Sequence, residues 1–242
     1  MSNVVAKRAV LPIAMALAIG MTSTASAAHI IGTPGDDRVR GTKRADVIDA
    51  QAGNDRVGAG KGPDTVTGGE GDDRIWGRWG ADRLFGGPGD DRLWGGLAAD
   101  QSWGDDGNDL MGGGPANDVQ HGGPGNDTIY AARGRDESFG DAGDDNLWAM
   151  ARRDVHGRND TLGDTLHGGE GNDTFRTRDG EQDNIDCGPG TDTAILDYRD
   201  VIVDANAQNP NGSCEVVNRD RRVKKGADAP EEAEPREDVS GN

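Results

Sequence analysis

Aspartates recur along the chain at a fixed spacing, and their carboxylates are the side chains most able to do chemistry. Asp occurs every nine residues from Asp37 to Asp154, at fourteen successive positions. Carboxylate oxygens are hard ligands that suit Ca²⁺. A row of metal sites formed by these carboxylates requires a fold in which one repeat stacks on the next, so the regular spacing predicts a repeat architecture.

The residues around each Asp follow a frame of nine positions, G-G-x-G-x-D-x-U-x, in which U is apolar. The frame is complete in Gly68–Trp76, Gly86–Trp94 and Gly122–Tyr130. Glycine at positions one, two and four is expected to allow positive φ and to bring backbone carbonyls close to an ion. Asp or Asn at position five is expected for its tolerance of the left-handed region. In a strand of three residues over positions seven to nine, only position eight would point inward.

These repeats resemble the RTX, or haemolysin-type, calcium-binding nonapeptide repeat family, over roughly residues 32–195. The resemblance implies an all-β fold, a parallel β-roll that is a right-handed β-solenoid, with two repeats in each coil. It implies that six residues of each repeat form a calcium-binding turn and three form a strand. It also implies Ca²⁺ as the bound ion.

With two repeats in a coil, residues eighteen apart stack, and the Asp residues fall on two edges of the roll. On the regular edge, position four is Gly, position five is Asp or Asn, and position eight is apolar from Asp37 to Asp145. On the degenerate edge, which starts at Asp46, these positions vary, and the inward residue changes from Ile48, Val66 and Leu84 to Ser102, Gln120, Ser138 and His156. We therefore expect calcium to fill the regular edge well, with about six good sites, and the degenerate edge poorly. The predicted metal ligands are Asp37, Asp55, Asp73, Asp91, Asp109, Asp127, Asp145, Asp173 and Asp192.

The period becomes irregular after Asp154, where the spacing alternates between ten and nine through Asp164, Asp173, Asp183 and Asp192. Strict counting moves Asp173 to the degenerate edge. In the alternative that we prefer, residues 149–167 form an enlarged excursion that restores Asp173 to the regular edge.

Composition favours cations as partners. The chain of 242 residues has 40 Gly and 44 Asp or Glu, only 33% apolar residues, and a formal net charge of −18. This charge argues against nucleic acid and anionic membranes as partners. Carboxylates stacked one strand spacing apart, ~4.8 Å, repel one another. We therefore expect the calcium-free chain to be largely unfolded and calcium binding to be coupled to folding.

The first residues follow the pattern of a secretory signal peptide, which we assign to residues 1–27. Lys7 and Arg8 precede an apolar run over 9–21, and Ala25–Ala27 forms an A-x-A cleavage site. The alternative is a membrane anchor, but the run is shorter than the ~20 residues that span a bilayer. We predict a secreted, extracellular protein without a membrane span in the mature chain.

The remaining domain boundaries follow from composition. We assign residues 28–195 to the roll, 196–217 to a C-terminal cap and 218–242 to a disordered, charged tail. Outside the cell, Cys214 of the cap can form a disulfide back to Cys187; the alternative is two separate thiols.

Catalytic motifs such as H-E-x-x-H, G-x-S-x-G and a Walker loop do not occur in the sequence, and we predict a protein that is not an enzyme. The predicted function is secreted calcium binding, with Ca²⁺ structural. The alternative is an extracellular adhesin or carbohydrate-binding module, with cell-surface polysaccharide or protein as the partner. It would use outward aromatic residues such as Trp76 and Trp94, which can equally serve as cross-strand stacking pairs. A weaker alternative is a polysaccharide-modifying enzyme on a related parallel β-helix.

Overall fold

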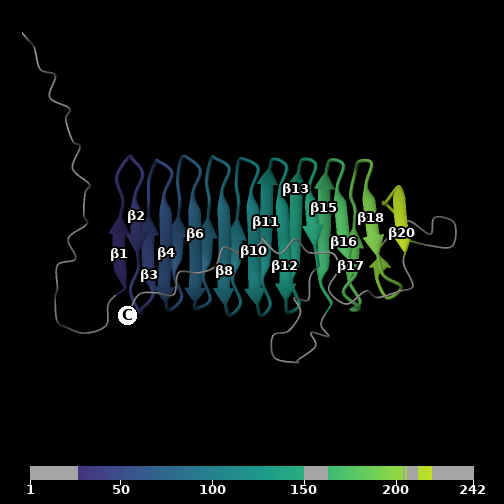
Figure 1. Cartoon of the computed structure of the whole chain (residues 1–242), viewed down its shortest axis with the longest axis horizontal. Helices are drawn as coiled ribbons and strands as arrows, with labels where there is room; N and C mark the ends of the chain where they lie inside the picture. Colours follow the sequence, from purple (N-terminus) through teal and green to yellow (C-terminus); the bar gives the residue numbers. More distant parts are fainter. Residues whose placement is uncertain (1–26, 150–162, 204, 206–211, 220–242) are drawn as a thin grey trace, which may run out of the picture.

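The chain forms a parallel β-solenoid of two sheets that run the length of the molecule (Figure 1). The computed structural model describes residues 27–149, 163–203, 205 and 212–219. The predicted signal peptide up to residue 26, the interior of the predicted excursion and the tail from residue 220 lie outside the described residues. Within those ranges the structure consists of strands, turns and bends, and no helix has the length and apolar character of a membrane span.

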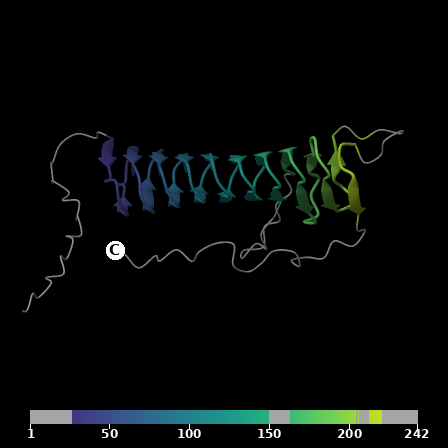
Figure 2. The ribbon, with the colours of Figure 1, turned by 90° about the horizontal axis from the view of Figure 1, so that it is seen from above.

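Successive strands alternate between the two sheets, which face each other in two rows in Figure 2. The first sheet contains β1 (Ala28–Ile31), β3 (Asp46–Asp49), β5 (Thr65–Thr67), β7 (Arg83–Phe85), β9 (Gln101–Trp103), β11 (Val119–Pro124), β13 (Glu137–Ala142), β15 (Thr165–Glu170), β17 (Asn184–Asp186) and β19 (Val201–Ile202). The second contains β2 (Arg38–Arg40), β4 (Arg56–Lys61), β6 (Arg74–Trp79), β8 (Arg92–Leu97), β10 (Leu110–Pro115), β12 (Thr128–Arg133), β14 (Asn146–Trp148), β16 (Thr174–Thr177), β18 (Thr193–Leu196) and β20 (Val216–Arg219).

The register confirms that two repeats make one coil. Arg38 pairs with Arg56, and Arg74 pairs with Arg92, so that each residue stacks on the one eighteen positions later. The regular-edge loops lead into the even-numbered strands, and the degenerate-edge loops lead into the odd-numbered strands. Several strands are longer than expected: β6 continues from positions seven to nine through the first three positions of the next repeat.

The irregular stretch leaves both sheets in register. β14 pairs with β16, and Asp145 and Asp173, which are 28 residues apart, occupy adjacent coils. Asp173 therefore lies on the regular edge, as in the alternative with an excursion. On the other sheet, Ser138 pairs with Leu166, so that Leu166 follows as the next inward residue. Residues Asp154 and His156, which strict counting placed in the frame, lie outside the described residues.

The interior of the roll is narrow and is filled by three positions of each repeat. Beyond the first two repeats, positions one, six and eight are buried, whereas positions seven and nine are exposed or half-buried, apart from the buried Gly58. Apolar position-eight side chains such as Ile75 and Leu93 are fully buried. Midway along the first sheet, three polar residues, Ser102, Gln120 and Ser138, occupy the same inward position and are also buried. The Ser138 hydroxyl lies 3.3 Å from the Gln120 amide, so this polar stretch is hydrogen-bonded within the roll.

The glycines of the turn have two distinct roles. Gly87 and Gly89, at positions two and four, have φ values of 108° and 146°, as expected. Gly86, at position one, does not have positive φ, so that part of the expectation is wrong. A Cβ at Gly86 would lie 2.3 Å from Asp91 Oδ2 and 2.6 Å from the carbonyl oxygen of Gly104. Gly86 is therefore glycine because oxygens of its own coil and of the next approach its Cα closely, whereas a few other repeats have a buried Ala at position one.

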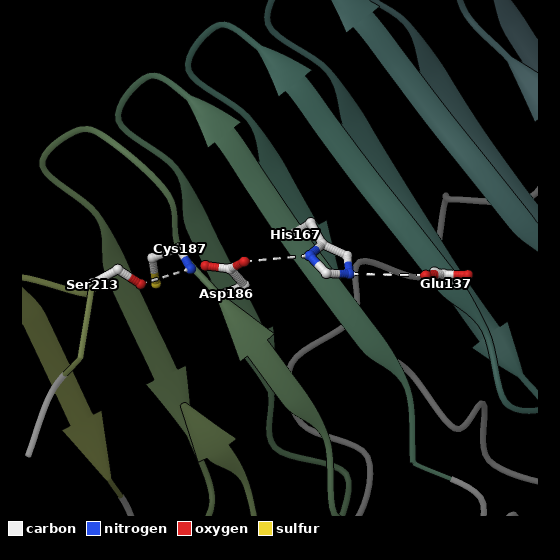
Figure 3. A network of polar contacts seen from close by, with 5 residues as sticks. All are labelled: Glu137, His167, Asp186, Cys187 and Ser213. Atoms are coloured by element: carbon white, nitrogen blue, oxygen red, sulfur yellow. Dashed lines mark hydrogen bonds and ion pairs between the residues drawn. The ribbon is translucent and has the colours of Figure 1, made fainter. Parts of the chain in front are cut away.

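The last coils are joined by the predicted disulfide. Cys187 and Cys214 are bonded, with their Cα atoms 5.3 Å apart, and both are buried. The backbone N–H of Cys187 also donates a hydrogen bond to Ser213 Oγ at 3.2 Å (Figure 3). β19 and β20 add the final rungs of the two sheets. β19 lies in the segment assigned to the cap, whereas β20 continues through Asn218 and Arg219, two residues into the segment assigned to the tail.

Candidate calcium ladders

The position-six aspartates form a continuous side-chain ladder along each edge. The backbone N–H of one Asp donates to Oδ1 of the Asp in the next coil: Asp73 to Asp91 at 2.7 Å on the regular edge, and Asp82 to Asp100 at 2.7 Å on the degenerate edge. The regular ladder ends at Glu215, whose Oε2 accepts the N–H of Asp192 at 2.8 Å. Each carboxylate thus uses one oxygen to join two coils.

The second carboxylate oxygen, Oδ2, is buried in most of these residues without a hydrogen-bond partner. This holds on the regular edge for Asp55, Asp73, Asp91, Asp109, Asp127, Asp145, Asp173 and Asp192, and on the degenerate edge for Asp64, Asp82, Asp100 and Asp118. A buried carboxylate oxygen is costly unless a donor or a cation compensates it. Because Oδ2 of Asp91 and the carbonyl oxygen of Gly104 both approach Gly86, two oxygens of the kind that Ca²⁺ prefers lie near one another. The arrangement fits a hard cation.

Burial makes these carboxylates poor at carrying a charge without compensation. Loss of solvation raises the pKa of Asp91 and of Asp100 to about 8, and repulsion from neighbouring aspartates adds to the effect. The backbone N–H bond from the preceding coil acts in the opposite direction and lowers the pKa of each. Near neutral pH, the folded ladder therefore favours either a proton or a cation at these positions.

The structure places all nine predicted metal ligands on one edge, in adjacent coils. Eight are buried; Asp37, in the first coil, is half-buried. Oδ2 of Asp37 accepts hydrogen bonds from the N–H of Thr33 at 2.6 Å and from Thr33 Oγ1 at 2.9 Å. The first position of the ladder thus differs from those that follow, because its second oxygen already has donors.

Position five carries a second ladder, which the sequence reasoning missed. The N–H of Asp144 donates to Asn126 Oδ1 at 2.7 Å, and the N–H of Asn126 donates to Asn108 Oδ1 at 3.0 Å. Similar bonds link the position-five residues of the regular edge from Asp36 to Asn172. None of the described position-five residues has positive φ, so the expected reason for Asp or Asn there is wrong. Their side chains serve as hydrogen-bond acceptors.

This second ladder distinguishes the hydrogen bonding of the two edges at position five. On the degenerate edge, where position five is mostly Ala, Pro or Arg, the described residues show one such bond, from the N–H of Arg135 to Asn117 Oδ1 at 3.0 Å. The position-six carboxylates, by contrast, have the same pattern of bonded and unpartnered oxygens on both edges. The preference of calcium for the regular edge therefore stays a prediction.

Outward aromatic side chains at position nine stack along each sheet. Trp76 and Trp94 have ring centroids 5.5 Å apart and planes 13° apart. On the other sheet, five rings form a continuous stack: Phe85, Trp103, His121, Phe139 and His167. His167 also lies between Asp186 and Glu137, at 3.6 Å and 4.0 Å (Figure 3). Because stacked rings cover one another's faces, this arrangement favours cross-strand stacking over a flat sugar-binding platform.

Comparison with known proteins agrees with this geometry. The model of the RTX calcium-binding nonapeptide repeat, which spans four copies of the repeat, matches residues 31–66, 59–93, 76–111, 112–147 and 160–194. No curated protein matches the chain closely enough to count as a relative. The family matches cover more than half of the sequence and coincide with the stacked coils. The chain belongs to the RTX calcium-binding nonapeptide repeat family.

Proposed function

We propose that this chain is a secreted calcium-binding repeat protein in which Ca²⁺ is structural and drives folding of the roll. The observation that carries the proposal is the row of buried Oδ2 atoms without hydrogen-bond partners, one in coil after coil. The ligands would be the nine predicted aspartates of the regular edge, from Asp37 to Asp192, together with backbone carbonyls of the turns. The secreted location is supported by the pattern of residues 1–27.

The coupling to folding follows from the same oxygens. In the unfolded chain each carboxylate is solvated, whereas folding buries it beside its neighbours at one-coil spacing. A divalent cation offsets this repulsion and replaces the lost hydration, so its binding free energy adds to the stability of the folded state. The turns would place the ligand oxygens, and the ion would compensate the negative charge of the buried aspartates.

The test is a calorimetric calcium titration of the chain starting at Ala28, with far-UV circular dichroism recorded in parallel. We expect β-structure to appear as calcium is added, with about six ions bound if the regular edge alone is used. Mg²⁺, which demands octahedral geometry and dehydrates reluctantly, should be far less effective. A chain that takes up no calcium, or whose dichroism is unchanged by it, would contradict the proposal.

Asp91 and Asp100 form a matched pair for deciding between the edges. Both are buried, both donate and accept in a ladder, and burial raises the pKa of each to about 8. Asn at either position keeps the Oδ1 acceptor and removes the charge. We expect Asp91→Asn to lower calcium uptake more than Asp100→Asn. Equal losses would refute the edge preference and leave the calcium-binding proposal standing.

A further inference from the structure

The degenerate edge ends in two loops that depart from the nonapeptide frame. The loop between β16 and β17 has one residue more than the usual turn and carries acidic residues near the positions where the frame has Gly. The loop between β18 and β19 follows it one coil later and is also acidic. Together they hold the terminal acidic cluster: Asp179, Glu181, Asp183, Asp197 and Asp200.

Three members of the cluster already have the spacing of a metal site. Asp179, Glu181 and Asp183 each offer a carboxylate oxygen, and these oxygens lie within 4.8 Å of one another. In the nonapeptide frame, each turn contributes one position-six carboxylate; here one loop contributes three. The cluster is therefore different in kind from the ladder sites.

Buried oxygens without partners point into this corner of the roll. Asp183 is fully buried; its Oδ1 accepts the N–H of Asp164 at 2.8 Å, and its Oδ2 has no hydrogen-bond partner. Asp197, on the neighbouring loop, is 1% exposed and also has an unpartnered Oδ2, as does Asp179. Buried carboxylate oxygens without hydrogen-bond donors are stabilised when they coordinate a cation.

Asp200 has a separate role and holds the two loops together. Its Oδ2 accepts Thr177 Oγ1 at 2.6 Å and the N–H of Asp197 at 2.7 Å, while its Oδ1 accepts the N–H of Asp183 at 3.3 Å. These bonds fix the loop carrying Asp197 against the loop carrying Asp183. The corner is thus preorganised by a carboxylate whose own oxygens are occupied.

We propose that the terminal acidic cluster binds one Ca²⁺ outside the nonapeptide frame and closes the end of the degenerate edge. Asp179, Glu181 and Asp183 would be its ligands from one loop and Asp197 its ligand from the next, with backbone carbonyls or water completing the six to eight oxygens that Ca²⁺ takes. The inference rests on the proposed function for the identity of the ion. It predicts that the edge with the poorest repeats has a strong site at its end.

The test compares two double variants of the chain starting at Ala28, with its disulfide intact, by equilibrium dialysis against ⁴⁵Ca²⁺. Asp179→Asn with Glu181→Gln removes two cluster carboxylates that lie outside the Asp ladder. Glu170→Gln with Asp186→Asn removes the same charge from exposed or half-exposed sites outside the cluster. We expect the first variant to bind one ion fewer than the parent and the second to bind as many. Calcium-dependent hydrogen-exchange protection over residues 177–203 should weaken in the first variant alone.

The outcomes separate this site from the ladder. If the parent binds calcium and the cluster variant binds as many ions with the same protection over 177–203, the terminal site is refuted and the proposed function stands. If the parent binds no calcium, the proposed function itself fails. Should the double variant not recover the parent's dichroism in calcium, Glu181→Gln alone is measured in the same way, and an unchanged count of ions then refutes the site.

Discussion

The position-five ladder gives the sharpest test of what holds one coil to the next, and Asn126 is the best place to apply it. Oδ1 of Asn126 accepts the N–H of Asp144 at 2.7 Å. Asn126 is exposed and neutral, so that replacing it with Ala changes neither the core nor the net charge. Asn126→Ala removes the acceptor and leaves the Asp144 N–H without it.

A hydrogen bond of this kind contributes about 0.5 to 1.5 kcal/mol to stability. We therefore expect Asn126→Ala to lower the free energy of unfolding by about 1 kcal/mol, roughly a fivefold change in the folding equilibrium. Asn126→Asp should retain most of the stability, because Asp fills the same position at 72 and 90 and accepts the same bond there. The assay is urea unfolding in saturating calcium, followed by far-UV circular dichroism.

The hydrogen-exchange rate of the Asp144 backbone amide gives a local readout that does not require all coils to unfold together. It should rise in Asn126→Ala and stay near the parent value in Asn126→Asp. Gln101→Ala, on the outward face of β9, serves as the control for truncating an exposed polar side chain. If Asn126→Asp is as damaging as Asn126→Ala, or if Asn126→Ala behaves like Gln101→Ala, the acceptor role is refuted.

Three further changes follow from the described contacts. In a calcium-free sample, protonation of the buried aspartates should stabilise the roll, because the pKa of Asp91 is raised from 3.8 to about 8 in the folded state. This contribution to stability is complete below about pH 4 and is lost as the pH rises through about 8. Far-UV circular dichroism of the chain in the presence of a calcium chelator would record the loss. Replacing Cys187 and Cys214 by Ala opens a link across 27 residues and should cost about 3 to 4 kcal/mol in urea unfolding. Ala116 has a φ of 106°, so Ala116→Gly should raise the melting temperature by relieving roughly 1 kcal/mol of strain, whereas Ala131→Gly, at a buried site without positive φ, should lower it.

Each of these expectations has a contrary result. Greater folding of the chelated chain at pH 8 than at pH 5 would show that repulsion within the buried ladder does not control stability. Equal stability of the reduced and oxidised parent would show that the disulfide does not constrain the unfolded chain. A lower melting temperature for Ala116→Gly would mean that the flexibility of glycine in the unfolded state outweighs the strain.

The repeat made the fold predictable to an unusual degree. A nine-residue period with one apolar position per repeat leaves few arrangements that bury Ile75 and Leu93 and stack the aspartates. The placement of Asp173 on the regular edge followed because the alternative would set a complete repeat among degenerate ones. The disulfide followed from there being two cysteines and an expected oxidising compartment.

What the period could not show were contacts between coils. Glycine is needed at Gly86 because Asp91 Oδ2 and the carbonyl oxygen of Gly104 approach its Cα closely, and the contact with Gly104 arises only when coils stack. The acceptor role of Asn126 likewise depends on the N–H that lies above it. The acidic residues Asp179 and Glu181 were a visible departure from the frame, but their closeness to Asp183 depends on how the irregular loop closes.

The strict register sets the step by which such a protein can grow or shrink. Because strands alternate between sheets and bond at a separation of eighteen residues, removing a whole coil, for example residues 74–91, returns every following residue to its own edge. Removing a single nonapeptide would exchange the two edges for the rest of the chain and set the fifth-position acceptors of one edge against the alanines and arginines of the other. The ten extra residues that separate Asp145 from Asp173, beyond the usual eighteen, are accommodated because they enter between two coils and leave both ladders intact. Duplication and loss should therefore act on this roll in whole coils, and additions of any length should enter only at its turns.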